Sequence, residues 1–79
     1  MNITIGIPAF NEEKNIGKVI VTLKKITNDI IVCDDGSNDL TREIAEGLGA
    51  KVISHTKNMG YGEAIKSILM KQRKKKQIF

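Results

Sequence analysis

The sequence contains a single cysteine (Cys33), one proline, one histidine and no tryptophan in 79 residues. One cysteine excludes an internal disulfide framework and a metal site built from several cysteines, and it favours a reducing compartment. No apolar run approaches the ~20 residues that span a bilayer. The first residues also lack the charged and then apolar layout of a signal peptide. We therefore expect a cytoplasmic protein, peripheral to a membrane at most.

Basic charge is concentrated near the C-terminal end. Five of the 13 Lys and Arg residues lie in residues 71–79, whereas all nine Asp and Glu residues precede residue 71. Residues 1–70 therefore carry a net charge of −1, and the basic residues form a tail. A nucleic-acid-binding fold is not indicated, but such a tail could contact an anionic membrane surface. The length and the 41% hydrophobic content predict one small folded domain with a thin core.

Strand and helix patterns alternate along the chain. Short apolar, β-branched runs predict strands at residues 3–7, 30–33 and 51–55. Apolar residues spaced by three and four predict helices that carry residues 16–26, 40–48 and 64–69. We expect Pro8 to end the first strand and Asn11 to cap the first helix. Ser37 or Asp39 is expected to cap the second helix and Gly49 to end it.

This order, β-α-β-α-β-α, predicts an α/β fold with a parallel three-stranded sheet, half of a doubly wound, Rossmann-like nucleotide-binding fold. Residues 77–79 resemble the beginning of a further strand. Ligands of such sheets bind beyond the carboxyl ends of the strands. The loops at residues 8–13, 34–39 and 56–62 are therefore the expected binding site.

The first of these loops offers a rigid turn and two groups suited to a nucleoside. Pro8 fixes the backbone, Phe10 presents a flat apolar face, and Glu12 supplies oxygens for paired hydroxyls such as those of ribose. The alternative is structural, because turns and caps use the same residue types everywhere. In that case Pro8 only ends the strand, and Phe10 only packs.

The second loop begins with two adjacent carboxylates, Asp34 and Asp35, at the end of a buried strand. Such a pair needs a compensating donor or a cation. Adjacent side chains point to opposite faces of a strand, so both can serve one ligand only after a turn, which Gly36 permits. One carboxylate could then accept the ring N–H of a base, while the other holds the loop or reaches the ribose. Caps and a turn are the structural alternative.

Two other uses of paired acids fit poorly. Haloacid-dehalogenase-type phosphatases require two Asp residues one position apart after the first strand, and here Cys33 occupies the earlier position after the second strand. Response-regulator receivers place the acidic pair after the first strand and need about 120 residues and a distal Lys.

The third loop places Gly60 and Gly62 at a helix start, where free N–H groups could bind an anion or the glycines could simply shape a turn. It is neither a dinucleotide fingerprint nor a Walker loop. His55 is expected to be a packed or capping residue. Cys33 is expected to be a small core residue.

Taken together, Ile7–Glu13, Val32–Ser37, Asn58–Gly62 and Ala64–Ser67 resemble the N-terminal part of family 2 glycosyltransferases, nearest to the dolichyl-phosphate-mannose-synthase-like branch. Glu63 and Ile68 depart from the family, which has small residues at these positions of its third helix. The resemblance implies a GT-A fold whose first half binds a UDP- or GDP-linked sugar. It implies that Pro8, Ala9 and Phe10 line the base pocket and that Glu12 approaches the ribose. Asp35 would contact the base with support from Asp34. The implied nucleotide-binding residues are Pro8, Ala9, Phe10, Glu12, Asp34, Asp35, Ser37 and Gly60.

The family continues into an Asp-x-Asp motif that holds Mg²⁺ or Mn²⁺ and later supplies a catalytic base. In this sequence no Asp or Glu follows Glu63. We therefore expect no cofactor in this chain and no sugar transfer by the isolated chain, because little would offset the charge on the leaving diphosphate. The expected organisation is a truncated nucleotide-sugar-binding domain at residues 1–70 and a basic tail at residues 71–79.

A truncated sheet would leave the outer edge of the first strand uncovered. We expect a second copy of the chain to cover that edge, giving a homodimer, or residues 77–79 to fold back onto it. An alternative function follows from the same features. The chain could be a structural or regulatory module that retains the scaffold and associates through the sheet edge or the basic tail.

Overall fold

The computed structural model describes residues 3–71 and 76–79, and in them strands and helices alternate. The elements are β1 (Thr4–Ala9), α1 (Ile16–Leu23), β2 (Ile30–Asp34), α2 (Thr41–Gly47), β3 (Lys51–Ser54), α3 (Tyr61–Lys71) and β4 (Lys76–Ile78). The α/β class is confirmed. No helix within the described ranges has the length and apolar character needed to cross a membrane. Residues 72–75 of the expected basic tail lie outside the described residues.

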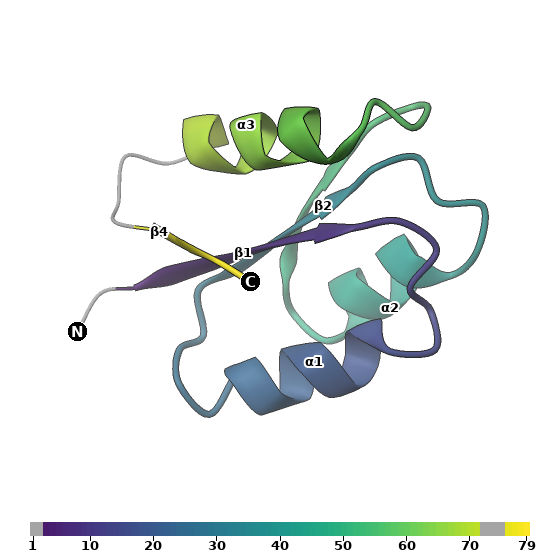
Figure 1. Cartoon of the computed structure of the whole chain (residues 1–79). Coiled ribbons are helices and arrows are strands. Elements are labelled where there is room, and N and C mark those ends of the chain that lie inside the picture. Colours follow the sequence, from purple (N-terminus) through teal and green to yellow (C-terminus); the bar gives the residue numbers. More distant parts are fainter. Residues whose placement is uncertain (1–2, 72–75) are drawn as a thin grey trace.

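The strands form one parallel sheet in the order β3-β2-β1-β4 (Figure 1). The sequence predicted three strands, and the described residues contain a fourth, which pairs with the first half of β1 from Thr4 to Gly6. The Phe79 amide extends this pairing by donating to the Gly6 carbonyl at 2.8 Å. The C-terminal segment therefore folds back onto the edge of β1, which is one of the two arrangements expected from the sequence.

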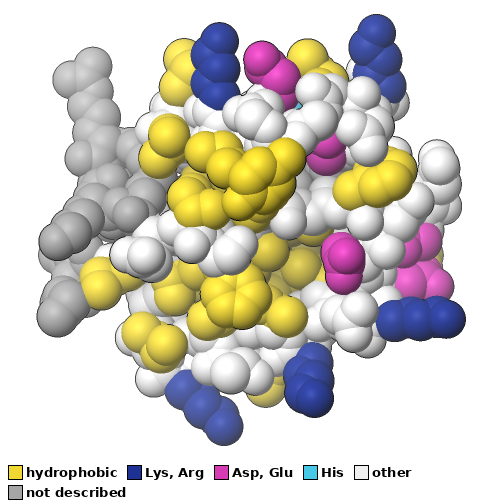
Figure 2. Space-filling view, viewed as in Figure 1, with side chains coloured by type: hydrophobic (Ala, Val, Ile, Leu, Met, Phe, Trp, Pro, Cys, Tyr) yellow, Lys and Arg dark blue, Asp and Glu magenta, His cyan; other side chains and the backbone are white. Residues whose placement is uncertain are grey.

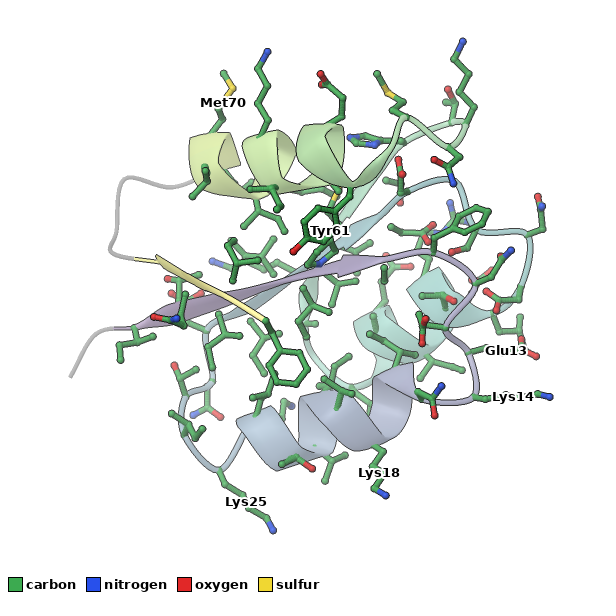
Figure 3. The ribbon with its side chains drawn as sticks, viewed as in Figure 1. Glu13, Lys14, Lys18, Lys25, Tyr61 and Met70 are labelled. Carbon is green, nitrogen blue, oxygen red and sulfur yellow. The ribbon has the colours of Figure 1, made fainter. Side chains whose placement is uncertain are left out.

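The helices cover both faces of the sheet, with α1 and α2 on one side and α3 on the other (Figure 1). Successive residues of β2 alternate between the two layers, because side chains of a strand point to opposite faces. Ile30 and Val32 join the core under α1 and α2, whereas Ile31 and Cys33 pack against α3. This double coverage explains the uninterrupted apolar run of β2. Figure 3 shows Lys18 and Lys25 extending away from the sheet.

Helix α3 approaches β1 closely at Gly6. A Cβ atom at Gly6 would overlap Cγ2 of Ile68, which is fully buried. Glycine is therefore required at this position for contact between the helix and the sheet.

Pro8 does not end β1, which continues to Ala9. The reason is the position of its nitrogen. The Gly6 carbonyl accepts a hydrogen bond from the Phe79 amide, so the polar backbone groups of Gly6 face β4. The backbone groups of every second residue in a strand face the same neighbouring strand, so the Pro8 nitrogen also faces the β4 side. Pairing with β4 stops at Gly6. The missing N–H of Pro8 therefore costs the sheet no hydrogen bond.

The helix starts also differ from the sequence prediction. Helix α1 begins at Ile16 after a turn, and Asn11 lies outside it with a φ of 52°. Ser37 does not cap α2, although Asp39 does accept hydrogen bonds from the amide and hydroxyl of Thr41. In both loops the polar side chains bind the neighbouring loop instead. Gly49 ends the second helical segment with a φ of 90°, as predicted.

Candidate functional site

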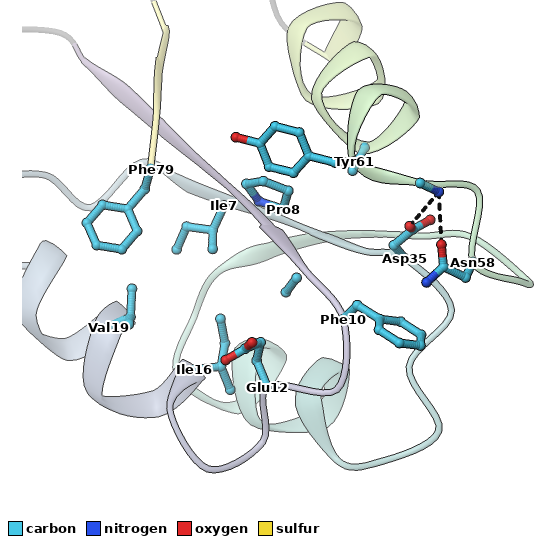
Figure 4. A pocket seen from close by; sticks show the side chains of 13 residues that line it. Ile7, Pro8, Phe10, Glu12, Ile16, Val19, Asp35, Asn58, Tyr61 and Phe79 are labelled. Atoms are coloured by element: carbon cyan, nitrogen blue, oxygen red, sulfur yellow. Dashed lines mark hydrogen bonds between the residues drawn. The ribbon is translucent and has the colours of Figure 1, made fainter.

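Phe10, Asp35 and Gly60, which come from the three predicted loops, border one pocket of about 370 Å³. The pocket opens between α1 and α3 at the carboxyl end of β1, and Figure 4 shows the side chains around it. Figure 2 shows hydrophobic side chains gathered around a hollow on this face. This volume lies within the range of small-molecule sites. Its lining comprises Ile7, Pro8, Ala9, Phe10, Glu12, Ile16, Val19, Asp35, Asn58, Gly60, Tyr61, Ala64 and Phe79.

The first and second loops hold each other through backbone amides. Ser37 Oγ accepts the Asn11 amide at 2.8 Å, and Asn11 Oδ1 accepts the Asn38 amide at 2.9 Å. The Glu12 amide donates to Thr41 Oγ1 at 2.8 Å. These reciprocal bonds fix the backbone that presents Phe10 and Glu12 to the pocket.

Asp35 joins the second loop to the third. Its side chain is 7% exposed. Oδ1 accepts hydrogen bonds from the Met59 amide at 2.9 Å and from His55 Nδ1 at 2.8 Å, while Oδ2 accepts from the Gly60 amide at 2.9 Å. One carboxylate therefore sets the path of the backbone into α3.

The environment of Asp35 favours its ionised form. Burial alone would raise its pKa, but the hydrogen bonds from His55 and from the amides of Met59 and Gly60 outweigh burial and lower the pKa. A carboxylate oxygen can accept two hydrogen bonds. Oδ1 has two donors and Oδ2 has the Gly60 amide, so Oδ2 retains the capacity to accept one more hydrogen bond, such as one from a ligand in the pocket.

Gly36 allows the chain to turn directly against the third loop. Its φ is 79°, and an added Cβ would lie 2.7 Å from the Asn58 nitrogen and 2.8 Å from Lys57 Cα. Both conformation and space therefore require glycine. Gly60 also has a positive φ, 97°, but an added Cβ there would meet nothing within 4 Å.

Six of the eight residues predicted from the sequence line the pocket: Pro8, Ala9, Phe10, Glu12, Asp35 and Gly60. Asp34 and Ser37 do not. Asp34 is 3% exposed and follows Ile30 and Val32 on the α1 and α2 side of the sheet, and its Oδ1 has no hydrogen-bond partner among the described residues. Its backbone carbonyl accepts the His55 amide at 2.9 Å. Ser37 holds Asn11, as described above.

The lining also contains residues that sequence reasoning did not assign to the site. Tyr61 and Phe79 are 65% and 62% exposed and flank the hollow. Tyr61 extends from the start of α3 across β1 (Figure 3). An aromatic residue between two glycines was a usable signal for Tyr61. No local pattern could place Phe79, because its position depends on the pairing of β4 with β1.

The anion site predicted at the third loop loses two of its donors. The Met59 and Gly60 amides are directed to Asp35. The following amides, from Tyr61 to Glu63, belong to the first turn of α3 and have no acceptor within the helix. These are the donors that an anionic group would meet.

The neighbourhood of Cys33 and His55 confirms that both side chains are packed. Burial, followed by the charges of Asp35 and Asp34, raises the pKa of the Cys33 thiol to about 11, so it stays protonated at neutral pH. In space, Cys33 Sγ lies 3.8 Å from His55 Nε2, although the residues are far apart in sequence.

Within residues 3–71 and 76–79, no group of three or more His, Cys, Asp or Glu side chains could hold a metal ion.

The model of glycosyl transferase family 2 matches residues 4–75. The chain therefore belongs to glycosyltransferase family 2. It is 37% identical over 71 residues to a dolichyl-phosphate hexose transferase of Haloferax volcanii. This match covers 87% of this chain and 31% of that protein. It is 39% identical over 56 residues to a glucosyl-3-phosphoglycerate synthase of Mycolicibacterium smegmatis, covering 66% of this chain and 18% of that protein.

A solved structure supports the same fold. Glucosyl-3-phosphoglycerate synthase of Mycobacterium tuberculosis, in complex with Mn²⁺, UDP-glucose and phosphoglyceric acid, superimposes with a TM-score of 0.75 at 33% identity. The match covers 86% of this chain and 28% of that chain. The chain thus spans less than a third of the length of each of these relatives.

Proposed function

We propose that the pocket binds the nucleoside part of a nucleotide-diphosphate sugar of UDP or GDP type. The observation that supports this most strongly is the convergence of Phe10, Asp35 and Gly60 on one pocket at the carboxyl end of β1. The family assignment and the UDP-glucose held by the M. tuberculosis enzyme support the same ligand class. In this proposal residues 1–70 form most of the binding domain. Strand β4 and Phe79, from the segment expected to be a basic tail, complete the sheet beside β1 and the lining of the pocket.

Each lining residue has a role that its chemistry allows. Phe10, Pro8 and Ala9 supply apolar surface for the base, and Oδ2 of Asp35 accepts a ring N–H. Glu12 is exposed at the pocket rim, and its carboxylate is suited to the ribose hydroxyls. Ser37 acts indirectly, since it holds the first loop through the Asn11 amide. Asp34 does not line the pocket, and no role in binding is proposed for its side chain.

We also propose that these 79 residues alone do not transfer sugar. Transfer requires stabilisation of the charge that develops on the leaving diphosphate. The described residues offer no metal-binding cluster for that purpose. The chain would then bind nucleotide sugar without turning it over, and further polypeptide would be needed for catalysis.

Calorimetric titration with UDP, GDP and UDP-glucose tests the binding proposal. Asp35→Asn should weaken the affinity by about ten- to a hundredfold, since it removes a hydrogen bond to a charged, buried acceptor. Glu46→Gln is the matched control because Glu46 is exposed on α2 and does not line the pocket. Equal affinities of the two variants, each shown to be folded, would contradict the role of Asp35. Absence of binding by the unmodified chain at millimolar nucleotide would contradict the function.

A second candidate is an interaction module, favoured by the position of β4 at the end of the sheet, where no other strand of the described residues pairs with its outer side. Strand β4 covers the edge of β1 only at Thr4–Gly6, so a second copy would pair with β4 rather than with that part of β1. Sedimentation at micromolar concentration should then show a dimer. Contact of the basic tail with a membrane should give binding to anionic vesicles that is lost when its five Lys and Arg residues (71, 73, 74, 75 and 76) are replaced by glutamine. A monomer that ignores anionic vesicles would refute this candidate. Nucleic acid is not proposed as a partner.

A further inference from the structure

The imidazole of His55 connects Asp35, the residue after β2, with α3. Its Nδ1 lies 2.8 Å from Asp35 Oδ1 and its Nε2 lies 2.9 Å from Ser67 Oγ on α3. The side chain is only 11% exposed. Both ring nitrogens are therefore engaged by groups from elements far apart in the sequence.

The ionisation of Asp35 determines how this chain of hydrogen bonds is arranged. An ionised carboxylate can only accept, so Nδ1 of His55 carries the proton and donates it to Asp35. In the neutral ring Nε2 is then unprotonated and accepts the hydrogen bond from the Ser67 hydroxyl. The Ser67 hydroxyl, at 2.9 Å, is nearer to this nitrogen than the Cys33 thiol, at 3.8 Å.

The distances resemble those of a Ser-His-Asp catalytic triad, but the surroundings do not. Neither His55 nor Ser67 lines the pocket, and the Asp35 carboxylate that His55 contacts is itself a lining group. His55 thus has no route to a reacting atom in the pocket except through Asp35. Its position behind Asp35 is that of a group that orients another.

We propose that His55 is a positioning residue, which orients the Asp35 carboxylate so that Oδ2 faces the ligand, while Ser67 fixes the imidazole. This inference rests on the proposed nucleotide site and assigns to it a residue outside the pocket lining. The contact at Oδ1 holds one end of the carboxylate, and the Gly60 amide holds the other. Loss of the His55 contact leaves the Oδ1 end to the Met59 amide alone.

Two substitutions separate the bonds of His55. In His55→Asn the side-chain amide reaches the place of Nδ1, so the bond to Asp35 is kept and the bond to Ser67 is lost. In His55→Gln the side-chain amide reaches the place of Nε2, so the bond to Ser67 is kept and the bond to Asp35 is lost. We expect His55→Asn to keep UDP or GDP affinity within about threefold, and His55→Gln to lose about tenfold or more, because a charged acceptor loses a donor.

A second readout needs no ligand. In ¹H–¹⁵N spectra, His55→Gln should shift the Met59 and Gly60 amide resonances strongly, whereas His55→Asn should leave them close to those of the unmodified chain. Ser67→Ala should change the ¹⁵N shift of Nε2 and leave Nδ1 protonated. Similar amide shifts in the Asn and Gln variants would overturn the positioning proposal. If the amide shifts follow the prediction but no nucleotide binds the unmodified chain, the proposed function fails and the positioning of Asp35 stands.

Discussion

Asp35 accepts a hydrogen bond from the Gly60 amide at 2.9 Å, and this contact joins the end of β2 to the start of α3. Both residues border the pocket. The link is charge-assisted, because the pKa of Asp35 is lowered by its hydrogen bonds despite its burial. The second and third loops of the candidate site are therefore joined by the same side chain that is proposed to contact the ligand.

Acid should destabilise the fold as Asp35 and Asp39 take up protons. In both residues burial would raise the pKa, but hydrogen bonds outweigh it and lower the pKa below the ordinary value. Carboxylates with a lowered folded-state pKa add stability at neutral pH, which is lost as the pH falls below about 4 and through the folded-state pKa. Urea denaturation between pH 2 and 7 should show this loss. Asp35→Asn should lose less unfolding free energy between neutral and acid pH than the unmodified chain. An equal loss in the variant and the unmodified chain would contradict the lowered pKa of Asp35.

Three glycine-to-alanine substitutions should differ in sign and size. Gly47 lies in α2 with open space around it, so Gly47→Ala should stabilise by about 0.5–1 kcal/mol. Gly60→Ala should destabilise by ~1–2 kcal/mol, because alanine disfavours a positive φ. Gly36→Ala should cost a further ~1–3 kcal/mol, since its Cβ also meets backbone atoms. Equal free energies of unfolding for the Gly36 and Gly60 variants would show that the close approach to Lys57 is wrong.

The contact between β1 and α3 predicts a coupled pair of substitutions. Gly6→Ala should destabilise by about 1–3 kcal/mol, because its Cβ overlaps Cγ2 of Ile68. Ile68→Leu removes that methyl branch at similar volume, so the double variant should be more stable than the sum of the single effects predicts. Ile20→Leu, in the core on the other face of the sheet, is the control and should be additive with Gly6→Ala. Additive behaviour of Gly6→Ala with Ile68→Leu would contradict the packing of α3 on Gly6.

The hydrogen bonds between the first two loops can be tested at Asn11. Replacement by alanine or by glycine removes the hydrogen bond to the Asn38 amide equally. Only glycine accepts a φ of 52° without strain, so Asn11→Ala should be less stable than Asn11→Gly by ~1 kcal/mol. Chemical denaturation measures the difference. A glycine variant as unstable as the alanine variant would mean that the backbone at residue 11 is not held in this conformation.

The sequence was sufficient to predict the α/β order and the three loops because those features depend on local periodicity. The alternation of Ile30 to Cys33 between two layers follows from strand geometry, and ligand sites at the carboxyl ends of parallel strands follow from topology. The motifs of the loops then indicated the family, and the match over residues 4–75 confirms it.

The errors arose where partners distant in sequence decide the outcome. Asn11 has the chemistry of a helix cap, but Ser37 and Asn38 in the neighbouring loop compete successfully for its polar groups. Pro8 is tolerated within β1 only because β4 is short. The sequence indicated a strand beginning at residues 77–79, but it left open whether this segment or a second copy covers β1. The bond from His55 to Asp35 likewise depends on the register of β3 beside β2, which no local pattern specifies.

The most direct measurement for the proposed function is a titration of the ¹⁵N-labelled chain with UDP and GDP, each compared with the free ribose phosphate. The account predicts saturable shifts of the Phe10, Asp35 and Gly60 amides with at least one of the two nucleotides, retained at moderate salt, while amides of α2 stay unchanged. Uniform absence of shifts at millimolar nucleotide, or shifts confined to the basic residues near the C-terminal end, would contradict it.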